Sequence, residues 1–387
     1  MLPNNKENGS GRNTLLNIAA GALWRLPGCF GVARLLGLSY SLRCVVFHDI
    51  SPNESLFTKG MRVSITPPDF EAALKFLTRY YTPVRLQDVL GVSEDRTLPS
   101  RPVLVTFDDG YASIMKWAAP LCGKFGVPAI IFLNAAFLDN VGLAPDNLVC
   151  YVANLLGMEA VNAAARTIGC ADIPELKSLA EVFLRFLPSI SLPQRRVFLD
   201  ALSRLGGINE RQLAGEAGLY LTRKQVGELA ASGFEIGNHT YTHVHGRSLT
   251  AADFGQEIVR NRAELEALSG KKVRSFSLPY GSSADLTNDL LRNLQLSGHA
   301  AAFLSESVAN PRGTDQVCFD RVSIHANKDD AFFLEIEVLP RLRTIRNRLS
   351  RGLSFVRMAR KNPFHSRLGR PHGKNRVATL DQMEPPV

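Results

Sequence analysis

Short apolar runs alternate with amphipathic stretches along most of the chain. The apolar runs are continuous, which is typical of strands buried on both faces of a parallel sheet. Their expected positions are residues 43–48, 103–107, 129–133, 234–237, 275–280, 300–304 and 318–325. The amphipathic stretches between them predict crossover helices, so the pattern favours an α/β sheet or barrel with parallel strands.

Residues 141–218 interrupt this alternation. They carry helical periodicity nearly throughout, and their strand signals are poor. We therefore expect a helical insert, residues 141–218, within a domain that runs from residue 41 to residue 330. Reactive groups gather at the carboxyl ends of parallel strands, so an insert placed there could border the cleft and select the substrate.

Both ends of the chain differ from this central domain. Residues 1–40 comprise a polar segment and an amphipathic helical stretch around Trp24, for which packing on the domain is favoured over membrane contact. Within residues 331–387, the stretch from Arg341 to Arg376 holds ten Arg, two Lys and no acidic residue. Apolar residues recur there at helical spacing, which predicts a basic amphipathic helix followed by a disordered basic tail.

Charge changes the picture less than the formal net charge of +9 suggests. Outside the basic stretch, acidic residues slightly outnumber basic ones. No nucleic-acid-binding motif accompanies the arginines, so nucleic acid is not an expected partner. Peripheral contact of the basic helix with an anionic membrane is one interpretation, and packing of that helix on the barrel is the other.

The cysteines and the first apolar stretch bear on the compartment. The six cysteines lie far apart without a C-x-x-C pair, which favours free buried thiols in a reducing compartment. Asn17 and Arg25 interrupt the first apolar stretch, so neither a signal peptide nor a transmembrane helix is expected. The sequence predicts a cytoplasmic protein that can lie peripherally on the inner membrane face.

Two aspartates and two histidines are the strongest candidates for chemistry. Asp108 and Asp109 directly follow a predicted strand, and His239 and His243 are four residues apart. This spacing is one helical turn, so both imidazoles can face a divalent metal that is completed by one carboxylate. The second carboxylate can then act as a base, although spacing alone leaves open which aspartate it is. On the same helix His245 would face away and be exposed.

Three motifs resemble those of the polysaccharide deacetylases, carbohydrate esterase family four, whose domain is also called the NodB homology domain. They are Thr106-Phe-Asp-Asp-Gly110, Gly237-Asn-His-Thr-Tyr-Thr-His243 and Pro279-Tyr-Gly281. The resemblance implies a distorted, seven-stranded (β/α) barrel. It also implies a divalent metal bound by Asp109, His239 and His243, with zinc as the first expectation and cobalt, nickel or manganese as alternatives. Asp108 would be the general base, and a backbone N–H at Tyr280 would hold the oxyanion.

Two positions depart from the family pattern. Better-known members carry an arginine two residues before the proline of the third motif, whereas this chain has Ser277, and Arg321 is the candidate for the missing cation. The family's last motif, a Leu-x-His that provides the general acid, has no clean match. His48 and His325 are the candidates. We favour His48 because it ends a predicted buried strand, whereas His325 precedes a polar run typical of a loop.

Together these features favour a hydrolase with an N-acetylated glycan as its partner. The expected reaction removes the N-acetyl group of an amino sugar in a polysaccharide, an oligosaccharide or a lipid-linked glycan precursor. Two alternatives stay open at this point: a catalytically degraded glycan-binding or scaffold protein, and an O-acetyl esterase on the same fold. The presence of Asp108 argues against pure binding, because binding needs no base beside the metal.

Overall fold

The computed structural model describes residues 24–25, 42–91, 98–169, 173–310 and 317–347. The chain divides into two units, residues 1–344 and residues 345–387, and the elements below belong to the first. Most of the two helices predicted near the chain ends lies outside the described residues. Trp24 is described, and its ring packs against Phe76, Tyr80 and Phe333 at centroid distances of 5.8, 5.2 and 5.4 Å.

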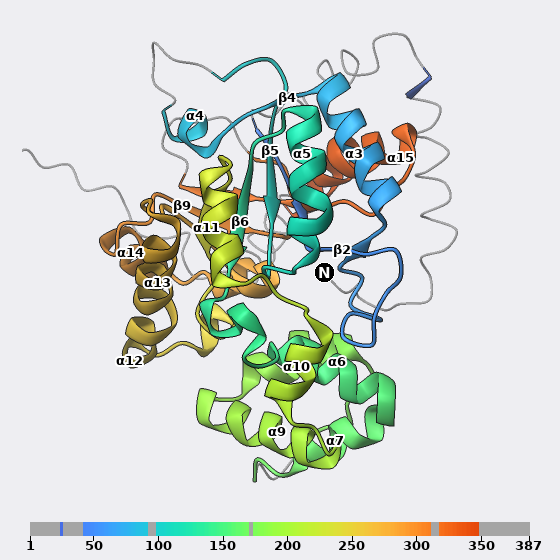
Figure 1. Ribbon diagram of the computed structural model, residues 1–387, viewed down its shortest axis with the longest axis vertical. Coiled ribbons are helices and arrows are strands. Elements are labelled where there is room, and N and C mark those ends of the chain that lie inside the picture. Colours follow the sequence, from blue (N-terminus) through green and yellow to red (C-terminus); the bar gives the residue numbers. More distant parts are fainter. Residues whose placement is uncertain (1–23, 26–41, 92–97, 170–172, 311–316, 348–387) are drawn as a thin grey trace, which may run out of the picture. The chain divides into compact units, whose positions relative to one another are not determined.

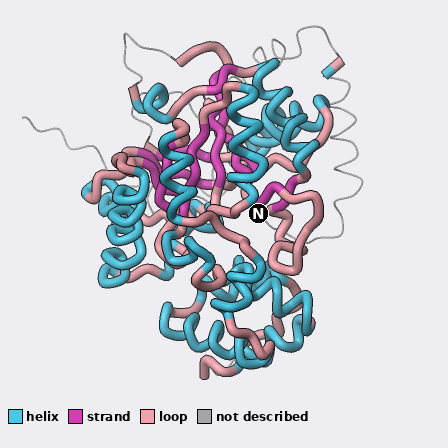
Figure 2. The backbone as a smooth tube through the Cα atoms, in the orientation of Figure 1, coloured by secondary structure: helices cyan, strands magenta, loops and turns pink. Residues whose placement is uncertain are grey.

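A parallel sheet curls into a nearly closed barrel that is wrapped by helices (Figure 1, Figure 2). Neighbouring strands follow the order β10-β9-β8-β7-β6-β5-β1-β11, and every pair is parallel. Short β4 (Thr82–Pro83) pairs with β5, and β2 (Asp49–Ile50) pairs with β3 (Ser64–Ile65) in a separate sheet. The barrel strands are β1 (Arg43–Phe47), β5 (Pro102–Phe107), β6 (Ala129–Leu133), β7 (Glu235–Asn238), β8 (Ser275–Ser277), β9 (Ala301–Leu304), β10 (Cys318–Asp320) and β11 (Val322–Ser323).

The last two strands are consecutive parts of one extended stretch, separated by Arg321 alone. β10 pairs with β9, while β11 pairs with β1 at the other end of the sheet. One stretch of chain therefore contacts both ends of the sheet and brings them together. The barrel predicted from the sequence is confirmed, with eight strands along the sheet instead of seven, because the last predicted strand changes its partner at Arg321.

Side-chain alternation along the strands divides the core in two. On β5, Val105 and Phe107 belong to the large cluster shared with the surrounding helices, whereas Leu104 belongs to a second cluster enclosed by the strands. Successive side chains of a strand point to opposite faces. Thr106 and Asp108 are therefore in phase with Leu104, and this alternation directs the Asp108 carboxylate into the barrel.

Helices cover the outer face of the barrel (Figure 1). Several begin with a side-chain cap, such as Thr222, whose hydroxyl accepts from the Gln225 N–H, and Thr250, which does the same for Asp253. They are α3 (Pro67–Tyr80), α4 (Leu86–Leu90), η2 (Ile114–Ala118) continued by α5 (Ala119–Phe125), α11 (Arg223–Ala231), α12 (Ala251–Phe254), η7 (Gly255–Val259), α13 (Arg260–Ser269), α14 (Asn288–Leu296), α15 (Asp329–Phe333) and η10 (Leu334–Val338).

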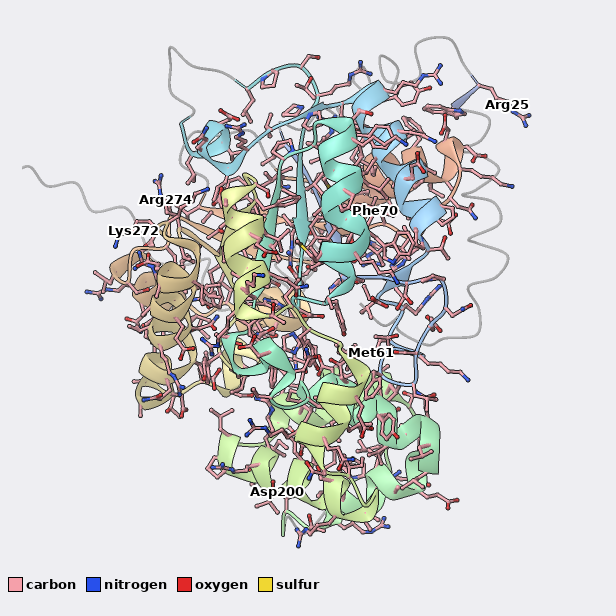
Figure 3. All side chains as sticks on the ribbon, in the orientation of Figure 1. Arg25, Met61, Phe70, Asp200, Lys272 and Arg274 are labelled. Carbon is pink, nitrogen blue, oxygen red and sulfur yellow. The ribbon has the colours of Figure 1, made fainter. Side chains whose placement is uncertain are left out.

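Within the segment between β6 and β7, residues 145–217 form the helical insert, green to yellow-green in Figure 1. It has a hydrophobic core of its own, built around Phe183, Phe186 and Phe198 and joined by Phe57 and Met61 from the loop after β2. Its principal helices are α6 (Pro145–Leu156), α7 (Met158–Arg166), α8 (Leu179–Glu181), η4 (Val182–Phe186), η5 (Leu187–Ser189), α9 (Leu192–Leu205) and α10 (Glu210–Ala217). Figure 3 draws the side chains of the described residues as sticks on the same ribbon.

None of the helices in the described part of the chain is both long enough and apolar enough to cross a bilayer. The cytoplasmic location and the contact of the basic tail with an anionic membrane stay predictions.

Candidate metal centre

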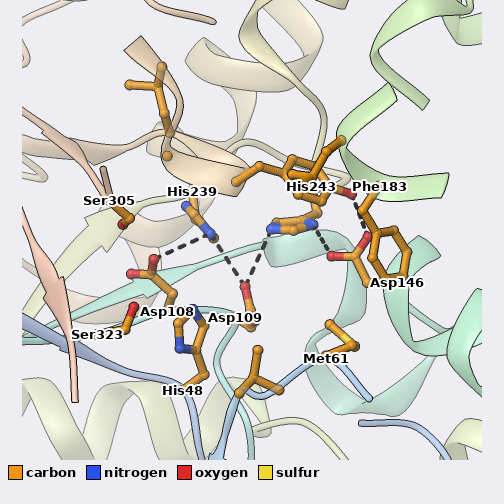
Figure 4. A pocket seen from close by; sticks show the side chains of 15 residues that line it. His48, Met61, Asp108, Asp109, Asp146, Phe183, His239, His243, Ser305 and Ser323 are labelled. Atoms are coloured by element: carbon orange, nitrogen blue, oxygen red, sulfur yellow. Dashed lines mark hydrogen bonds and ion pairs between the residues drawn. The ribbon is translucent and has the colours of Figure 1, made fainter. Parts of the chain in front are cut away.

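The candidate site lies where several parallel strands end on the same side of the barrel. His48 follows β1, Asp108 follows β5 and His239 follows β7, and all three line one pocket (Figure 4). Leu184 of the insert and Met61 of the loop after β2 also line it. The pocket therefore has polar groups from the barrel at its base and apolar side chains from the insert and loop beside them.

A sharp corner after β5 directs two neighbouring carboxylates to the same place. Asp108 continues the inward side of the strand, while Asp109 and Gly110 both have φ of +69°, in the left-handed region. Gly110 cannot be replaced easily, because a Cβ there would lie 2.6 Å from Leu133 Cδ2. The corner turns Asp109 back toward the pocket, so both carboxylates reach one site, as a strand-to-turn corner allows.

Asp109, His239 and His243 form a group whose three ligand atoms lie within 4.8 Å of one another. Asp109 Oδ1 is 3.3 Å from His239 Nε2 and 3.4 Å from His243 Nε2. His239 Nδ1 lies 2.8 Å from the Ser277 carbonyl oxygen, which can only accept a hydrogen bond. The Nδ1 atom therefore carries the proton and Nε2 keeps its lone pair, so one carboxylate and two imidazoles fit a divalent metal with an open position.

The two imidazoles converge from a loop rather than from a helix, so the helical interpretation of their spacing is wrong. β7 ends at Asn238, and the chain from His239 to His245 is irregular, with left-handed φ of +63° at Thr240 and +56° at His243. Asn134 holds this loop to the barrel by donating to the Thr240 carbonyl at 2.8 Å. Two reversals of the backbone bring the imidazoles together across the four-residue spacing, and a helical pattern does not predict such reversals.

His245 is buried, with 4% of its surface exposed, and not exposed as the helical interpretation predicted. Its Nε2 lies 2.9 Å from the Phe183 carbonyl oxygen of the insert, and its Nδ1 lies 3.4 Å from Asp285. Its ring stacks on the Tyr280 ring at a centroid distance of 3.7 Å and an angle of 4°. Because the loop is irregular, His245 turns toward the site's surroundings instead of away from them.

Arg321 and Asp108 form a fully buried, two-pronged ion pair. The Nη1 and Nη2 atoms of Arg321 each lie 2.7 Å from one Asp108 oxygen, and Arg321 has no exposed surface. Burial opposes ionisation of Asp108, but the Arg321 guanidinium together with His239 outweighs it, so the pKa of Asp108 is lowered. The structure thus brings the predicted cation to the predicted base.

The small Ser277 side chain allows the Arg321 guanidinium to reach Asp108 from a different strand. Its hydroxyl accepts from Arg321 Nη2 at 2.7 Å, and its small side chain is fully buried on β8. Arg321 enters from the interruption between β10 and β11 and lies over the ring of Phe132, 5.4 Å from its centroid. The absence of an arginine at position 277 leaves space that the Arg321 guanidinium fills.

The two candidates for the general acid occupy different surroundings. His48 is half-buried and lines the pocket beside Asp108 and Asp109 (Figure 4). Burial lowers the pKa of His48, and the two carboxylates oppose that shift. His325 is an exposed residue outside the set that lines the pocket, and its backbone N–H donates to Glu335. The geometry agrees with the preference for His48, whereas its role stays a prediction.

Tyr280 lies in a tight turn at the edge of the pocket. Tyr280 and Gly281 have left-handed φ of +63° and +65°. A Cβ on Gly281 would come within 2.5 Å of Ser305, so the third motif needs glycine there. The Tyr280 ring packs near His243, with centroids 5.0 Å apart, which places the turn next to a candidate metal ligand.

Two buried charged residues of the insert also touch the site, and neither was predicted from the sequence. Asp146 of α6 lies 2.8 Å from His243 Nδ1, and Arg195 of α9 donates to the His243 carbonyl at 3.0 Å. Asp146 follows Pro145 at a helix start, where acidic residues are common for reasons of helix polarity alone. Nothing in the pattern separates either residue from an ordinary helix-surface charge.

The fold and the site define a class: a parallel (β/α) barrel with a candidate metal centre at its carboxyl end. Residues 204–299 match the family model described as polysaccharide deacetylase. The putative polysaccharide deacetylase YxkH of Bacillus subtilis is 32% identical over 94 residues, which are 24% of this chain and 31% of that protein. The match thus spans about a third of the relative's length.

A solved structure shares the fold at low sequence identity. The Streptococcus pyogenes deacetylase PplD, in complex with acetate, superposes with a TM-score of 0.51 and 13% identity, over 76% of this chain and 97% of that one. The predicted resemblance is therefore confirmed: residues 204–299 match the polysaccharide deacetylase model, and the barrel has the fold of a solved deacetylase.

Proposed function

We propose that this protein is a metal-dependent hydrolase that removes the N-acetyl group from an amino sugar in a polysaccharide, an oligosaccharide or a lipid-linked glycan precursor. One observation carries the proposal. A three-ligand group of Asp109, His239 and His243 stands beside Asp108, a second carboxylate that is paired with a buried arginine. A binding site would require the ligands but not the second carboxylate.

In this proposal Asp109 Oδ1 and the Nε2 atoms of His239 and His243 hold the metal. Zinc is the first candidate, with cobalt, nickel or manganese as alternatives, since imidazole and carboxylate ligands suit all four. When bound, such an ion would polarise the acetamide carbonyl and lower the pKa of water. The Nδ1–H of His239, held by the Ser277 carbonyl, fixes the imidazole in the tautomer that metal binding requires.

Asp108 is proposed as the general base. Its carboxylate is ionised because Arg321 stabilises the negative charge, and one of its oxygens lies 3.8 Å from His239 Nε2, next to the ligand group. It can accept the proton that the attacking water loses. Arg321 then keeps that carboxylate in one orientation through two hydrogen bonds.

His48 is proposed as the general acid, and the Tyr280 N–H as the donor to the oxyanion. The sugar amine leaves more easily when it receives a proton, and His48 is the titratable imidazole that lines the pocket without belonging to the ligand group. The left-handed φ of Tyr280 fixes its backbone at the pocket edge, where a preorganised N–H can stabilise developing negative charge.

The test is acetate release from N-acetylglucosamine oligomers by metal-free protein, before and after addition of zinc or cobalt. We expect release that depends on metal and is absent in Asp108→Asn. O-acetylated glycans are assayed in parallel to separate amide from ester hydrolysis. If metal-loaded protein released no acetate from any N-acetylated glycan, the proposed activity would be wrong.

A further inference from the structure

The helical insert contacts the histidine loop through groups that are buried and charged. Asp146, in the first turn of α6, is 5% exposed, and Arg195, on α9, is 8% exposed. Buried charges are costly unless they are paired or hydrogen-bonded, so their placement requires defined partners. Those partners all belong to the candidate site.

Asp146 lies on the side of His243 opposite the ligand group. Its Oδ2 is 2.8 Å from His243 Nδ1, whereas His243 Nε2 faces Asp109. A carboxylate at Nδ1 favours the tautomer with a proton there, which leaves the Nε2 lone pair for a metal. Asp146 thus lies at the Nδ1 atom of His243, as the Ser277 carbonyl oxygen lies at the Nδ1 atom of His239.

The other oxygen of Asp146 binds Tyr280. Its Oδ1 accepts a hydrogen bond from the Tyr280 hydroxyl. One carboxylate therefore holds a candidate metal ligand and the turn that carries the candidate oxyanion donor.

Arg195 stabilises the histidine loop by binding its backbone. Its Nη2 donates to the carbonyl oxygens of Thr242 and His243 at 2.6 and 3.0 Å. These bonds support the loop where His243 has its left-handed φ, a conformation that costs free energy unless the surroundings enforce it.

We propose that Asp146 is a positioning residue of the metal centre, and that the helical insert is thereby a structural part of that centre. It fixes the His243 imidazole and the Tyr280 turn relative to each other. The inference rests on the proposed function, because it takes Asp109, His239 and His243 as the metal ligands. Asp146 itself is not a ligand in this arrangement, since it contacts the nitrogen of His243 that faces away from Asp109.

The experiment measures metal binding directly in the whole 387-residue chain. Zn²⁺ affinity is determined by competition with a chromophoric chelator for wild type, Asp146→Asn and Asp146→Ala, and the visible bands of bound Co²⁺ report ligand geometry. We expect Asp146→Ala to weaken Zn²⁺ binding by about 10–100-fold and to alter the Co²⁺ spectrum. Asp146→Asn, of nearly the same size, should lower Zn²⁺ affinity by about tenfold. The amide has only one acceptor oxygen, so its NH2 group must face either His243 Nδ1–H or the Tyr280 hydroxyl.

Two further variants separate positioning from general damage. Asp200→Asn removes an exposed carboxylate from α9 of the same insert and should leave Zn²⁺ affinity and the Co²⁺ spectrum unchanged. Tyr280→Phe removes only the hydroxyl, so Zn²⁺ affinity should change by less than about threefold while kcat falls, because the turn loses one anchor. Circular dichroism shows which variants are folded. If Asp146→Ala does not fold, the test rests on Asp146→Asn.

The outcomes distinguish this inference from the proposed function. Folded Asp146 variants with wild-type Zn²⁺ affinity and Co²⁺ spectrum would overturn the positioning role, even if the wild type releases acetate. Weakened Zn²⁺ binding in these variants supports the role, even if the wild type proves inactive on every N-acetylated glycan. A wild-type protein that binds none of the four metals would overturn both proposals.

Discussion

The barrel and the helical insert contribute to one pocket by different means. Barrel side chains such as His48, Asp108 and His239 stand directly after strands, so the sheet itself fixes their positions. Asp146 and Arg195 stand on helices and reach the site through the packing of the insert. The barrel thus places the candidate reacting groups, while the insert supports them.

The two regions also have separate hydrophobic cores. The barrel cluster packs strands against helices around residues such as Phe70 and Phe107, whereas the insert cluster is built around Phe186 and Phe198. A region with its own core can keep its shape when the other is altered. Substitution of the barrel residues Asp108, Arg321 or His48, which are outside the ligand group, should therefore lower the rate with metal still bound, and substitutions in the insert should lower metal affinity first.

The largest effect is expected for Asp108→Asn. Removing the base should lower kcat by about 10³–10⁴-fold, while Zn²⁺ affinity changes little, because Asp108 is outside the ligand group. Acetate release and Zn²⁺ competition are measured on the same preparations. An Asp108→Asn protein with more than a tenth of wild-type kcat would leave the barrel without its proposed base.

Arg321→Met tests whether the barrel's buried cation serves the base. Leaving the Asp108 carboxylate buried without its partner should cost about 3–5 kcal/mol of unfolding free energy. The double variant Arg321→Met with Asp108→Asn should recover most of this loss, because no unpaired charge remains. Urea unfolding measures both. Additive losses would mean that the ion pair is not coupled as the distances of 2.7 Å indicate.

The same substitution should change the pH profile. In the wild type, the pKa of Asp108 is lowered, so the base is ionised well below neutral pH. Without Arg321 the pKa of Asp108 rises, and the acidic limb of kcat/KM should move to higher pH. Arg321→Lys keeps the charge but loses the two-pronged geometry, so its limb should lie between those of wild type and Arg321→Met.

His48→Ala compared with His325→Ala tests which histidine is the acid. Loss of a general acid should lower kcat by about 10²-fold, and we expect this for His48, which lines the pocket. The exposed His325 should tolerate alanine with a change below about twofold, as is common for surface positions. The reverse ranking would reject His48. A substrate with a better leaving group should partly restore kcat in the variant that lacks the general acid and should have no such effect in the other variant.

The barrel was predictable because short stretches of the sequence are enough to indicate its strands. Continuous apolar runs predicted its strands, and the Asp108-Asp109 corner and the position of His48 followed from where those runs end. The division of the last strand at Arg321 was not predictable, because it depends on which strand each half meets when the sheet closes. That closure is a tertiary event with no pattern in the chain.

The supports of the site were not predictable for a related reason. The structure brings the predicted ligands His239 and His243 together, but their convergence comes from left-handed residues at Thr240 and His243 rather than from a helix. Neither residue is a glycine, so the sequence carries no signal for these reversals. Asp146 is far from the histidines in sequence, and only the packing of the insert brings them together.

The smallest effect we argue is that of Arg195→Ala in the insert. Arg195 binds two loop carbonyls and no candidate ligand atom, so its loss should weaken Zn²⁺ binding by about tenfold, the worth of one charged hydrogen bond. Arg196→Ala, an exposed neighbour on the same helix, is the matched control and should bind Zn²⁺ as the wild type does. If Arg195→Ala instead lowered kcat with Zn²⁺ affinity intact, the insert would affect the chemical step directly, and the division of labour between the two regions would fail. Equal behaviour of the two variants would show that the loop keeps its shape without the insert's cation, leaving Asp146 as the insert's essential contact.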